Sequence, residues 1–223
     1  MPLPLIRLAV VDSTQAFLRR NTHLGHCAVV ADRQTEGRGR QGNRWESAAG
    51  AGLWLSAALP SPSGVAPGLV LQRAMTAAAR VLDPGGRTLG LKWPNDLVAW
   101  EAGRLVKLGG IIGEQIGGRL LLGLGVNLTE APVIPGRAIP PACLKELGLD
   151  PPPTVDVATL IIEHWKNLGK ELQPLFKWPE SGTSLRWEDG QGVCLGWEAD
   201  GRLKVATADG VRRLSSGDIS GLA

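Results

Sequence analysis

The chain has 223 residues, of which 43% are hydrophobic and 20% charged, and its formal net charge is +3. That length and hydrophobic content suit one substantial domain with a small second one, and they exclude a chain too polar to form a core. The mild positive charge permits phosphate or nucleic-acid partners without requiring them, and no run of roughly 18 apolar residues predicts a membrane span.

The N-terminus lacks the charged start, apolar core and small-residue cleavage site of a secretory signal. Cys27, Cys143 and Cys194 are widely spaced, which predicts neither a disulfide framework nor a CxxC zinc site. We therefore expect a reduced, cytoplasmic compartment. His23 and His26 beside Cys27 could suggest a metal cluster, but no further ligand stands close in sequence, and a loop between a helix and a strand is the simpler interpretation.

The first part of the chain predicts strands, two helices and one long loop. Asp12 or Ser13 can cap a short helix over residues 14–20, and residues 66–82 carry the apolar spacing of a second helix. Residues 33–51 are polar and rich in glycine and arginine, and such long loops are often functional. Short apolar runs predict strands over residues 5–11, 27–32, 53–59, 89–93, 97–100, 105–115 and 120–128.

The order of these elements predicts the fold class. Ala102-Gly103 and Gly117-Gly118 stand at hairpin positions among the later runs, which therefore form a meander. We expect an α/β (α+β) fold with a mixed, largely antiparallel sheet flanked by helices, rather than a doubly wound sheet.

The second part changes in character along its length. Residues 132–153 hold seven prolines and predict an irregular connection, whereas residues 156–176 carry the clearest helical spacing. We expect one domain over residues 1–182 and a small β-barrel-like module over 183–223. Its strands are predicted at residues 193–197, 202–206 and 211–214, separated by Asp-Gly turns.

The segment GRGRQGNRW, residues 37–45, holds three arginines, three glycines and no acidic residue. Glycines let backbone N–H groups approach a ligand, arginines offer fork-shaped donors to phosphate or carboxylate, and Trp45 offers a face on which a base can stack. The segment suits a nucleotide. A solvated basic loop with one core tryptophan explains it equally well, because it matches neither the Walker nor the Rossmann pattern.

Three later segments combine polar residues with strand ends: KWPND at 92–96, KLGGI at 107–111 and GLGVNL at 123–128. Together with Asp12-Ser13-Thr14 and GRGRQGNRW, in this order, they resemble the biotin–protein ligases from about residue 12 to 128. The resemblance continues more weakly beyond, where it implies a small SH3-like domain over 183–223 after a catalytic biotin- and ATP-binding domain over 1–182.

The resemblance implies a two-step reaction. Biotin and MgATP would give biotinoyl-5'-AMP, and biotin would then pass to the side-chain amine of a specific lysine on the biotin carboxyl carrier protein or domain of a biotin-dependent carboxylase. ATP and biotin would be substrates, with Mg²⁺ required.

The resemblance also implies roles for individual residues. The short hydroxyls and amide of Ser13, Thr14 and Gln34 suit the ureido ring of biotin, which has two N–H donors and one carbonyl. The loop at Gly37, Arg38, Gly39 and Arg40 would close over biotin and the phosphates. The implied biotin-binding residues are Ser13, Thr14, Gln34, Gly37, Arg38, Arg40, Lys107, Gly110 and Ile111, the last two lining an apolar wall.

For the nucleotide, the resemblance implies contacts with Arg38, Arg40, Trp45, Lys92, Asn95 and Asn127. Asn95 and Asp96 would hold Mg²⁺ or orient the incoming lysine. Lys92 would contact phosphate or only pair structurally with Asp96.

The implied catalytic residues are Lys107, Arg40 and Arg38. Biotin carboxylate must attack the α-phosphate of ATP, and a cation between these two anions lowers their repulsion and stabilises the transition state. From the residues alone, a surface lysine of a strand is the favoured interpretation of Lys107.

The chain departs from the family pattern in two places. Gln41 and Asn43 stand where family loops of the form GRGRRGRxW have arginine, which lowers the loop charge. Only 11 residues precede Asp12, so we expect no helix-turn-helix domain and no DNA partner. We also expect no membrane partner, and a homodimer through a sheet edge stays open.

Two other functions compete with this one. A lipoate–protein ligase would have a related fold with a different Arg- and Gly-rich signature and a deeper apolar pocket. A nucleic-acid-binding module would use the Arg-rich loop and the small barrel, but the basic residues do not interleave with several aromatic side chains as a stacking platform requires.

Overall fold

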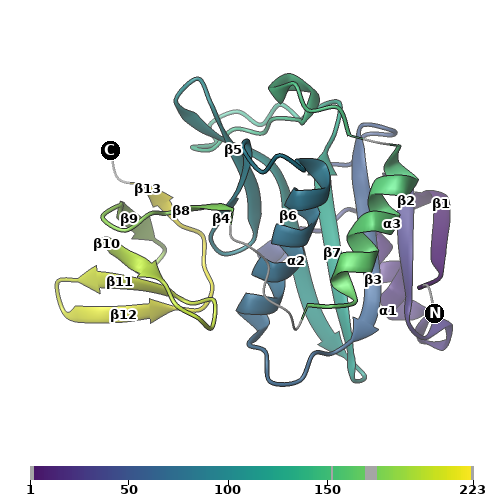
Figure 1. The fold of residues 1–223 in the computed structure, drawn as a ribbon, viewed down its shortest axis with the longest axis horizontal. Coiled ribbons are helices and arrows are strands. Elements are labelled where there is room, and N and C mark those ends of the chain that lie inside the picture. The colour runs from purple at the N-terminus through teal and green to yellow at the C-terminus, as the bar shows by residue number, and fades with distance from the viewer. Residues whose placement is uncertain (1–2, 152, 169–174, 222–223) are drawn as a thin grey trace.

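The computed structural model describes residues 3–151, 153–168 and 175–221, which form a large sheet with helices and a smaller sheet beside it (Figure 1). The elements of the large part are β1 (Leu5–Val11), α1 (Thr14–Arg20), β2 (Cys27–Gln34), β3 (Gly52–Pro60), α2 (Pro67–Leu82), β4 (Leu89–Lys92), β5 (Asp96–Glu101), β6 (Arg104–Ile116), β7 (Arg119–Asn127), α3 (Thr154–Trp165) and β8 (Phe176–Trp178). The smaller sheet holds β9 (Ser184–Trp187), β10 (Gly190–Trp197), β11 (Leu203–Thr207), β12 (Gly210–Leu214) and β13 (Ser220–Gly221). Single 3-10 turns lie at η1 (Thr22–Leu24), η2 (Arg40–Gly42) and η3 (Lys145–Leu147).

The large sheet has the strand order β1-β2-β3-β7-β6-β5-β4-β8. Its pairs are antiparallel except at the two edges, where β1 runs parallel to β2 and β8 parallel to β4. The predicted mixed, largely antiparallel fold class is therefore confirmed. The hairpins form where predicted, with positive φ at Ala102, Gly103, Gly117 and Gly118, as tight turns between twisted strands require.

Helices cover both faces of this sheet. The apolar sides of α2 and α3 pack on one face and enclose the main core, with Met75, Ile161 and Trp165 almost fully buried. On the opposite face α1 buries Leu18 against β2, β3 and β7. Ser13 caps α1 by accepting a hydrogen bond from the amide of Ala16 at 3.4 Å, which confirms the predicted cap. Because α1 is only seven residues long, it leaves part of its face of the sheet uncovered.

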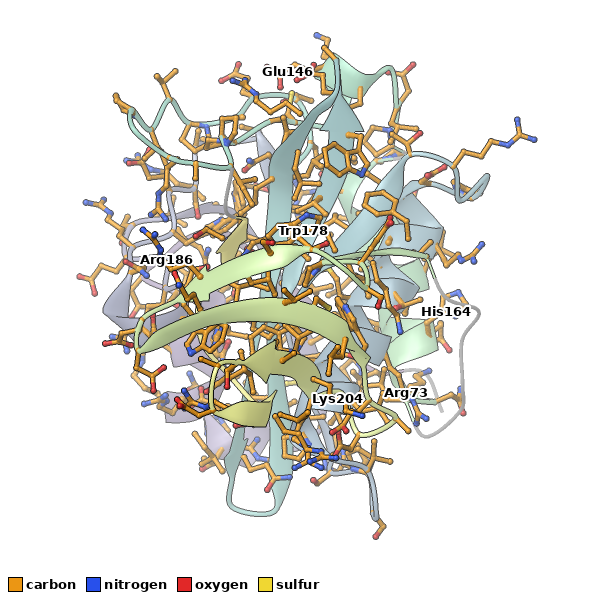
Figure 2. All side chains as sticks on the ribbon, turned by 90° about the vertical axis from the view of Figure 1, so that its left-hand side faces the viewer. Arg73, Glu146, His164, Trp178, Arg186 and Lys204 are labelled. Carbon is orange, nitrogen blue, oxygen red and sulfur yellow. The ribbon has the colours of Figure 1, made fainter. Side chains whose placement is uncertain are left out.

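The smaller sheet is fully antiparallel, in the order β12-β11-β10-β9-β13, and Figure 2 looks onto it from outside, with Arg186 on β9 and Lys204 on β11. Trp93, which directly follows β4, packs in the core of this smaller sheet and is fully buried. Trp93 Nε1 donates to the Gly201 carbonyl at 3.1 Å, and Gln72 on α2 donates to the same carbonyl at 2.7 Å. The two sheets are thus joined by packing and by buried hydrogen bonds.

The helix predicted over residues 156–176 is wrong at its end. Helix α3 stops at Trp165, and Phe176 lies in β8, where its ring packs over Gly90. The part of the prediction that falls on residues 169–174 lies outside the described residues. Strands β8, β9 and β13 were not predicted, and a domain division after residue 182 stays a prediction.

Of the helices in the described ranges, none combines the length and the apolar character that crossing a bilayer requires.

Candidate functional site

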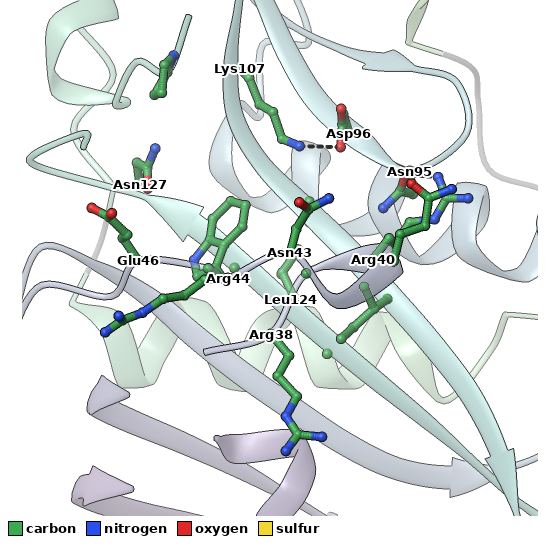
Figure 3. A pocket seen from close by; sticks show the side chains of 18 of the residues that line it. Arg38, Arg40, Asn43, Arg44, Glu46, Asn95, Asp96, Lys107, Leu124 and Asn127 are labelled. Carbon is green, nitrogen blue, oxygen red and sulfur yellow. Dashed lines mark hydrogen bonds and ion pairs between the residues drawn. The ribbon is translucent and has the colours of Figure 1, made fainter. Parts of the chain in front are cut away.

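A cavity of about 260 Å³ lies on the α1 face of the large sheet, where the short helix leaves the strands uncovered. Its walls come from five separate parts of the chain: the start of α1, the Arg-rich loop, the turn after β4, the proline-rich segment after β7, and the segment that leads into β13. Of the predicted site residues, those lining the cavity are Ser13, Thr14, Gln34, Arg38, Gly39, Arg40, Trp45, Lys92, Asn95, Asp96, Lys107, Gly110 and Asn127 (Figure 3).

One end of the cavity is neutral and built for hydrogen bonding. Gln34 Oε1 accepts from the Thr14 amide at 2.8 Å and from its hydroxyl at 3.1 Å. Thr14 Oγ1 also lies 2.8 Å from Ser56 Oγ, and Gln34 Nε2 donates to Ser47 Oγ at 3.1 Å. These bonds fix the rotamers of both side chains before any ligand arrives.

The floor of the cavity is made of glycine. Strand positions alternate between faces, and the cavity face of β6 and β7 carries Gly110, Gly123 and Gly125. The indole of Trp45 lies over this floor, so close that a Cβ at Gly125 would stand 2.6 Å from Trp45 Cε2. Trp45 Nε1 is buried and has no hydrogen-bond partner, so this donor is available to a ligand polar group.

The other end of the cavity holds alternating charges. Lys107 Nζ lies 2.7 Å from Asp96 Oδ1, and Lys92 Nζ lies 3.7 Å from Asp96 Oδ2 (Figure 3 shows the first pair). Lys92 also pairs with Asp218 Oδ1 at 3.3 Å and is only 3% exposed. Lys107 stands 5.8 Å from the centre of the Trp45 ring, within cation–π range.

A β-bulge turns Lys107 toward this end. Lys107 and Gly110 are three residues apart, so in a regular strand they would face opposite sides of the sheet. The register between β5 and β6 shifts at Leu97/Val98, where Leu97 pairs with Gly109 and Val98 with Lys107. The extra residue, Leu108, goes into the core, and Lys107 comes onto the cavity face.

The Arg-rich loop reaches across the cavity to the charged end. Arg40 Nη1 donates to Asn95 Oδ1 at 3.0 Å and to the Gly217 carbonyl at 3.3 Å. Arg38 is exposed and its guanidinium points away from Lys107 (Figure 3). Gln41 adopts φ 54°, a left-handed conformation that costs energy for a residue with a Cβ.

The sequence and the structures of known proteins identify the family of this chain. Residues 8–129 match the model of the biotin/lipoate A/B protein ligase family. The chain belongs to this family. The family match covers all five sequence motifs named above, from Asp12 to Leu128.

Individual relatives resemble this family member over different lengths. The bifunctional ligase/repressor BirA of Escherichia coli (strain K12) is 35% identical over 128 residues, which span 54% of this chain and 39% of BirA. The biotin–[acetyl-CoA-carboxylase] ligase of Mycobacterium tuberculosis is 28% identical over 216 residues, 86% of this chain and 77% of that ligase. The solved structure of the biotin protein ligase from Aquifex aeolicus in complex with biotin and ATP is similar with a TM-score of 0.79, at 27% identity and 98% coverage of both chains.

Two predicted residues of this family member do not line the cavity. Ile111 is fully buried in the main core, because it faces the opposite side of β6 from Gly110, and Ile112 forms the apolar wall in its place. Gly37 is buried in the turn of the Arg-rich loop, where a Cβ would stand 2.4 Å from the Trp45 carbonyl oxygen. Its contribution is to the loop conformation.

The predicted Mg²⁺ ligands do not fit a resident metal ion. Both Asp96 oxygens face lysine ammonium groups, Asn95 Oδ1 accepts from Arg40, and Asn95 Nδ2 donates to the Ile111 carbonyl at 2.7 Å. Among the described residues no group of three His, Cys, Asp or Glu side chains could hold a metal. In this arrangement Asn95 and Asp96 therefore do not form a site for a resident Mg²⁺.

Sequence reasoning missed several residues of the cavity. Gln15 lines it beside Thr14, Arg137 and Ile139 line it from the proline-rich segment, and Asp218 and Ser220 line it from the C-terminal part. Gln15 could have been found from the sequence, because it directly follows the Ser13-Thr14 motif. Arg137, Ile139 and Asp218 stand in irregular segments that carry no periodic pattern, and Ser220 stands in the two-residue strand β13, which is too short to show one.

Proposed function

We propose that this chain is a biotin–protein ligase: it forms biotinoyl-5'-AMP from biotin and MgATP, then transfers biotin to a lysine amine of a biotin carboxyl carrier domain. The observation that carries the proposal is one cavity with a neutral hydrogen-bonding end at Thr14 and Gln34 and a cationic end at Lys107. Biotin has the matching polarity, with a neutral ureido ring at one end and a carboxylate at the other. The chain spans 39% of BirA, so activity, substrates and acceptor are all part of this proposal.

The neutral end favours biotin over lipoate. A ureido ring offers two N–H donors and a strong carbonyl acceptor, whereas a dithiolane ring offers only weak sulfur acceptors. The fixed hydroxyls and amide of Thr14, Gln34 and Ser56 would lose hydrogen bonds to water without replacement if a dithiolane covered them, and each such loss costs about 1–3 kcal/mol.

In the first step, a biotin carboxylate oxygen attacks the α-phosphorus of ATP, and the bond from that phosphorus to the pyrophosphate oxygen breaks. No proton has to move, so the work of the protein is to align two anions and to stabilise the added charge. Lys107 supplies a positive charge at this end of the cavity, and Asp96 orients its ammonium group. Arg40, anchored on Asn95, supplies a second cation from the loop above.

In the second step, the acceptor lysine loses a proton to solvent and its neutral amine attacks the acyl carbon. The bond from that carbon to the phosphate oxygen breaks, AMP leaves with the bonding electrons, and the second proton of the new amide nitrogen also passes to solvent. The mixed anhydride is reactive toward water, so a loop that covers it protects the intermediate. No cysteine of the enzyme is assigned a covalent role, because all three are buried and burial raises the pKa of the Cys27, Cys143 and Cys194 thiols.

The rival nucleic-acid function has less support. The basic side chains converge into a bounded cavity instead of forming an open groove with several exposed aromatic rings. The absence of a DNA partner and the possible homodimer stay predictions.

The test mixes the full chain with MgATP, biotin and a carrier domain and detects biotin on the carrier with streptavidin. Parallel reactions replace biotin with lipoate or the carrier lysine with arginine. Labelling only with biotin and only on the intact lysine supports the proposal. Modification with lipoate but not biotin would assign the chain to the other branch of its family, and salt-sensitive binding to single-stranded nucleic acid without labelling would revive the rival.

A further inference from the structure

The charges around the cavity pose a problem for the second substrate of the proposed function. Six cationic side chains line the cavity: Arg38, Arg40, Arg44, Lys92, Lys107 and Arg137. They suit biotin carboxylate and ATP phosphates. The acceptor, however, is a lysine, which arrives as an ammonium ion because its ordinary pKa is about 10.4. A cation that enters a cationic cavity needs a carboxylate to receive it.

Three carboxylates line the cavity, and two of them are poorly suited. Asp96 has a side chain only 12% exposed, with one oxygen facing Lys107 and the other facing Lys92. Glu46 is exposed, and Figure 3 shows its carboxylate pointing away from the Lys107–Asp96 pair. An ammonium held there would be displaced from the charged end.

Asp218 has the required exposure and position. Its side chain is 79% exposed, and one oxygen contacts Lys92 at 3.3 Å. Among the residues that the structure describes, its other oxygen accepts no hydrogen bond. Lys92 in turn contacts Asp96, and Asp96 contacts Lys107, so Asp218 is the outer end of a continuous row of charges that leads to Lys107.

The backbone on both sides of Asp218 is anchored. The Gly217 carbonyl accepts a hydrogen bond from Arg40, and Ile219 is 3% exposed in the core of the smaller sheet beside Trp93. An exposed carboxylate on a fixed backbone loses little entropy when it binds a cation, which suits recognition.

We propose that Asp218 receives the ammonium group of the acceptor lysine at the mouth of the cavity. This inference rests on the proposed function. The carboxylate binds the ammonium form at the mouth, and the amine attacks only after it has moved inward and lost a proton to solvent. Asp218 takes no part in bond making, so its loss acts on acceptor binding. It makes the C-terminal segment a determinant of acceptor recognition.

The experiment compares Asp218→Asn with Asp209→Asn, a matched loss of one exposed carboxylate in the turn before β12, outside the cavity. Transfer is measured against carrier concentration at saturating biotin and MgATP. Asp218→Asn is expected to raise the KM for carrier on the order of fivefold, the upper range for an exposed ion pair, with a smaller change in kcat. Asp209→Asn is expected to behave like the unmutated chain.

A binding measurement separates recognition from an indirect effect through Lys92. Each ligase is loaded with a non-transferable ester analogue of biotinoyl-AMP and titrated with carriers that have lysine or glutamine at the acceptor position. The unmutated chain should prefer the lysine carrier, and Asp218→Asn should lose that preference. If the preference survives, or if the KM for ATP rises as much as that for carrier, Asp218 only supports Lys92 and the inference is wrong. If the unmutated chain does not label the carrier at all, the proposed function fails instead.

Discussion

Replacing Lys107 with alanine tests the centre of the proposed site. The ammonium group of Lys107 is 2.7 Å from Asp96 Oδ1 and its side chain is 33% exposed, so it can leave Asp96 and reach a ligand without unpacking the core. If it stabilises the charge that develops between carboxylate and α-phosphate, its loss should slow adenylation by about two to three orders of magnitude. Lys107→Arg keeps the positive charge but changes the shape of the group that carries it, so its adenylation rate should lie between those of the unmutated chain and Lys107→Ala.

The assay is biotin-dependent exchange of labelled pyrophosphate into ATP, which reports the first step without a carrier. Lys145→Ala serves as the control, because Lys145 is exposed in η3 and does not line the cavity. Thermal unfolding of each variant should stay cooperative if the fold is retained. This control matters because, among the described residues, the more distant Lys92 is the ion-pair partner that Asp96 keeps. Exchange by Lys107→Ala at the rate of the unmutated chain would refute the assignment.

Contacts of Arg40, Gly125 and Asp12 can be tested in the same way. Arg40→Gly removes the hydrogen bond that anchors the loop to Asn95. The rate at which biotinoyl-AMP escapes should rise roughly tenfold to a hundredfold, the equivalent of one charge-assisted hydrogen bond. Streptavidin signal on an added bystander protein measures this escape, and no increase despite active adenylation would mean that Arg40 does not retain the intermediate. Gly125→Ala should displace the Trp45 indole, because the added methyl group overpacks a tight contact, and should raise the KM for ATP by about tenfold. An unchanged KM for ATP together with an unchanged near-ultraviolet circular dichroism spectrum would show that the indole does not move. The hydrogen bond from Arg20 lowers the pKa of Asp12. Asp12 therefore stabilises the fold above its unfolded pKa of about 3.9, and this contribution is lost as the pH falls through the folded pKa. The difference in urea midpoint between the unmutated chain and Asp12→Asn should vanish in acid, and a difference that stays constant with pH would contradict this explanation.

The elements of the large sheet could be predicted because their signals are local. Strand alternation, a Ser cap and glycine turns each depend on a few neighbouring residues, and these neighbours agree with the tertiary structure. The end of α3 could not be predicted in this way. The apolar spacing continues to Phe176, but Phe176 packs its ring over Gly90 as part of β8, a contact with a residue far away in sequence.

The face on which a side chain lies was harder to predict than the strand that carries it. Gly110 and Ile111 are adjacent in one motif, and only the alternation of β6 decides that Gly110 faces the cavity and Ile111 the core. Lys107 depends on a bulge whose only sign is a register shift against β5. Asp218 reaches the cavity because the second sheet is docked through Trp93, and no local pattern encodes that approach.

The glycines of the KLGGI and GLGVNL motifs acquire a common explanation from the sheet. Gly110, Gly123 and Gly125 have ordinary strand conformations, so they are not needed for turns. They lie on the α1 face of β6 and β7, in the part that α1 leaves uncovered, where any side chain would fill the hollow or meet a residue already there. A Cβ at Gly123 would stand 2.1 Å from Gln15 Oε1, just as one at Gly125 would meet Trp45. The motifs therefore encode a shape as much as a set of ligand contacts: glycine keeps the floor low, and the charged and hydrogen-bonding groups around it come from the strand ends and loops at its rim.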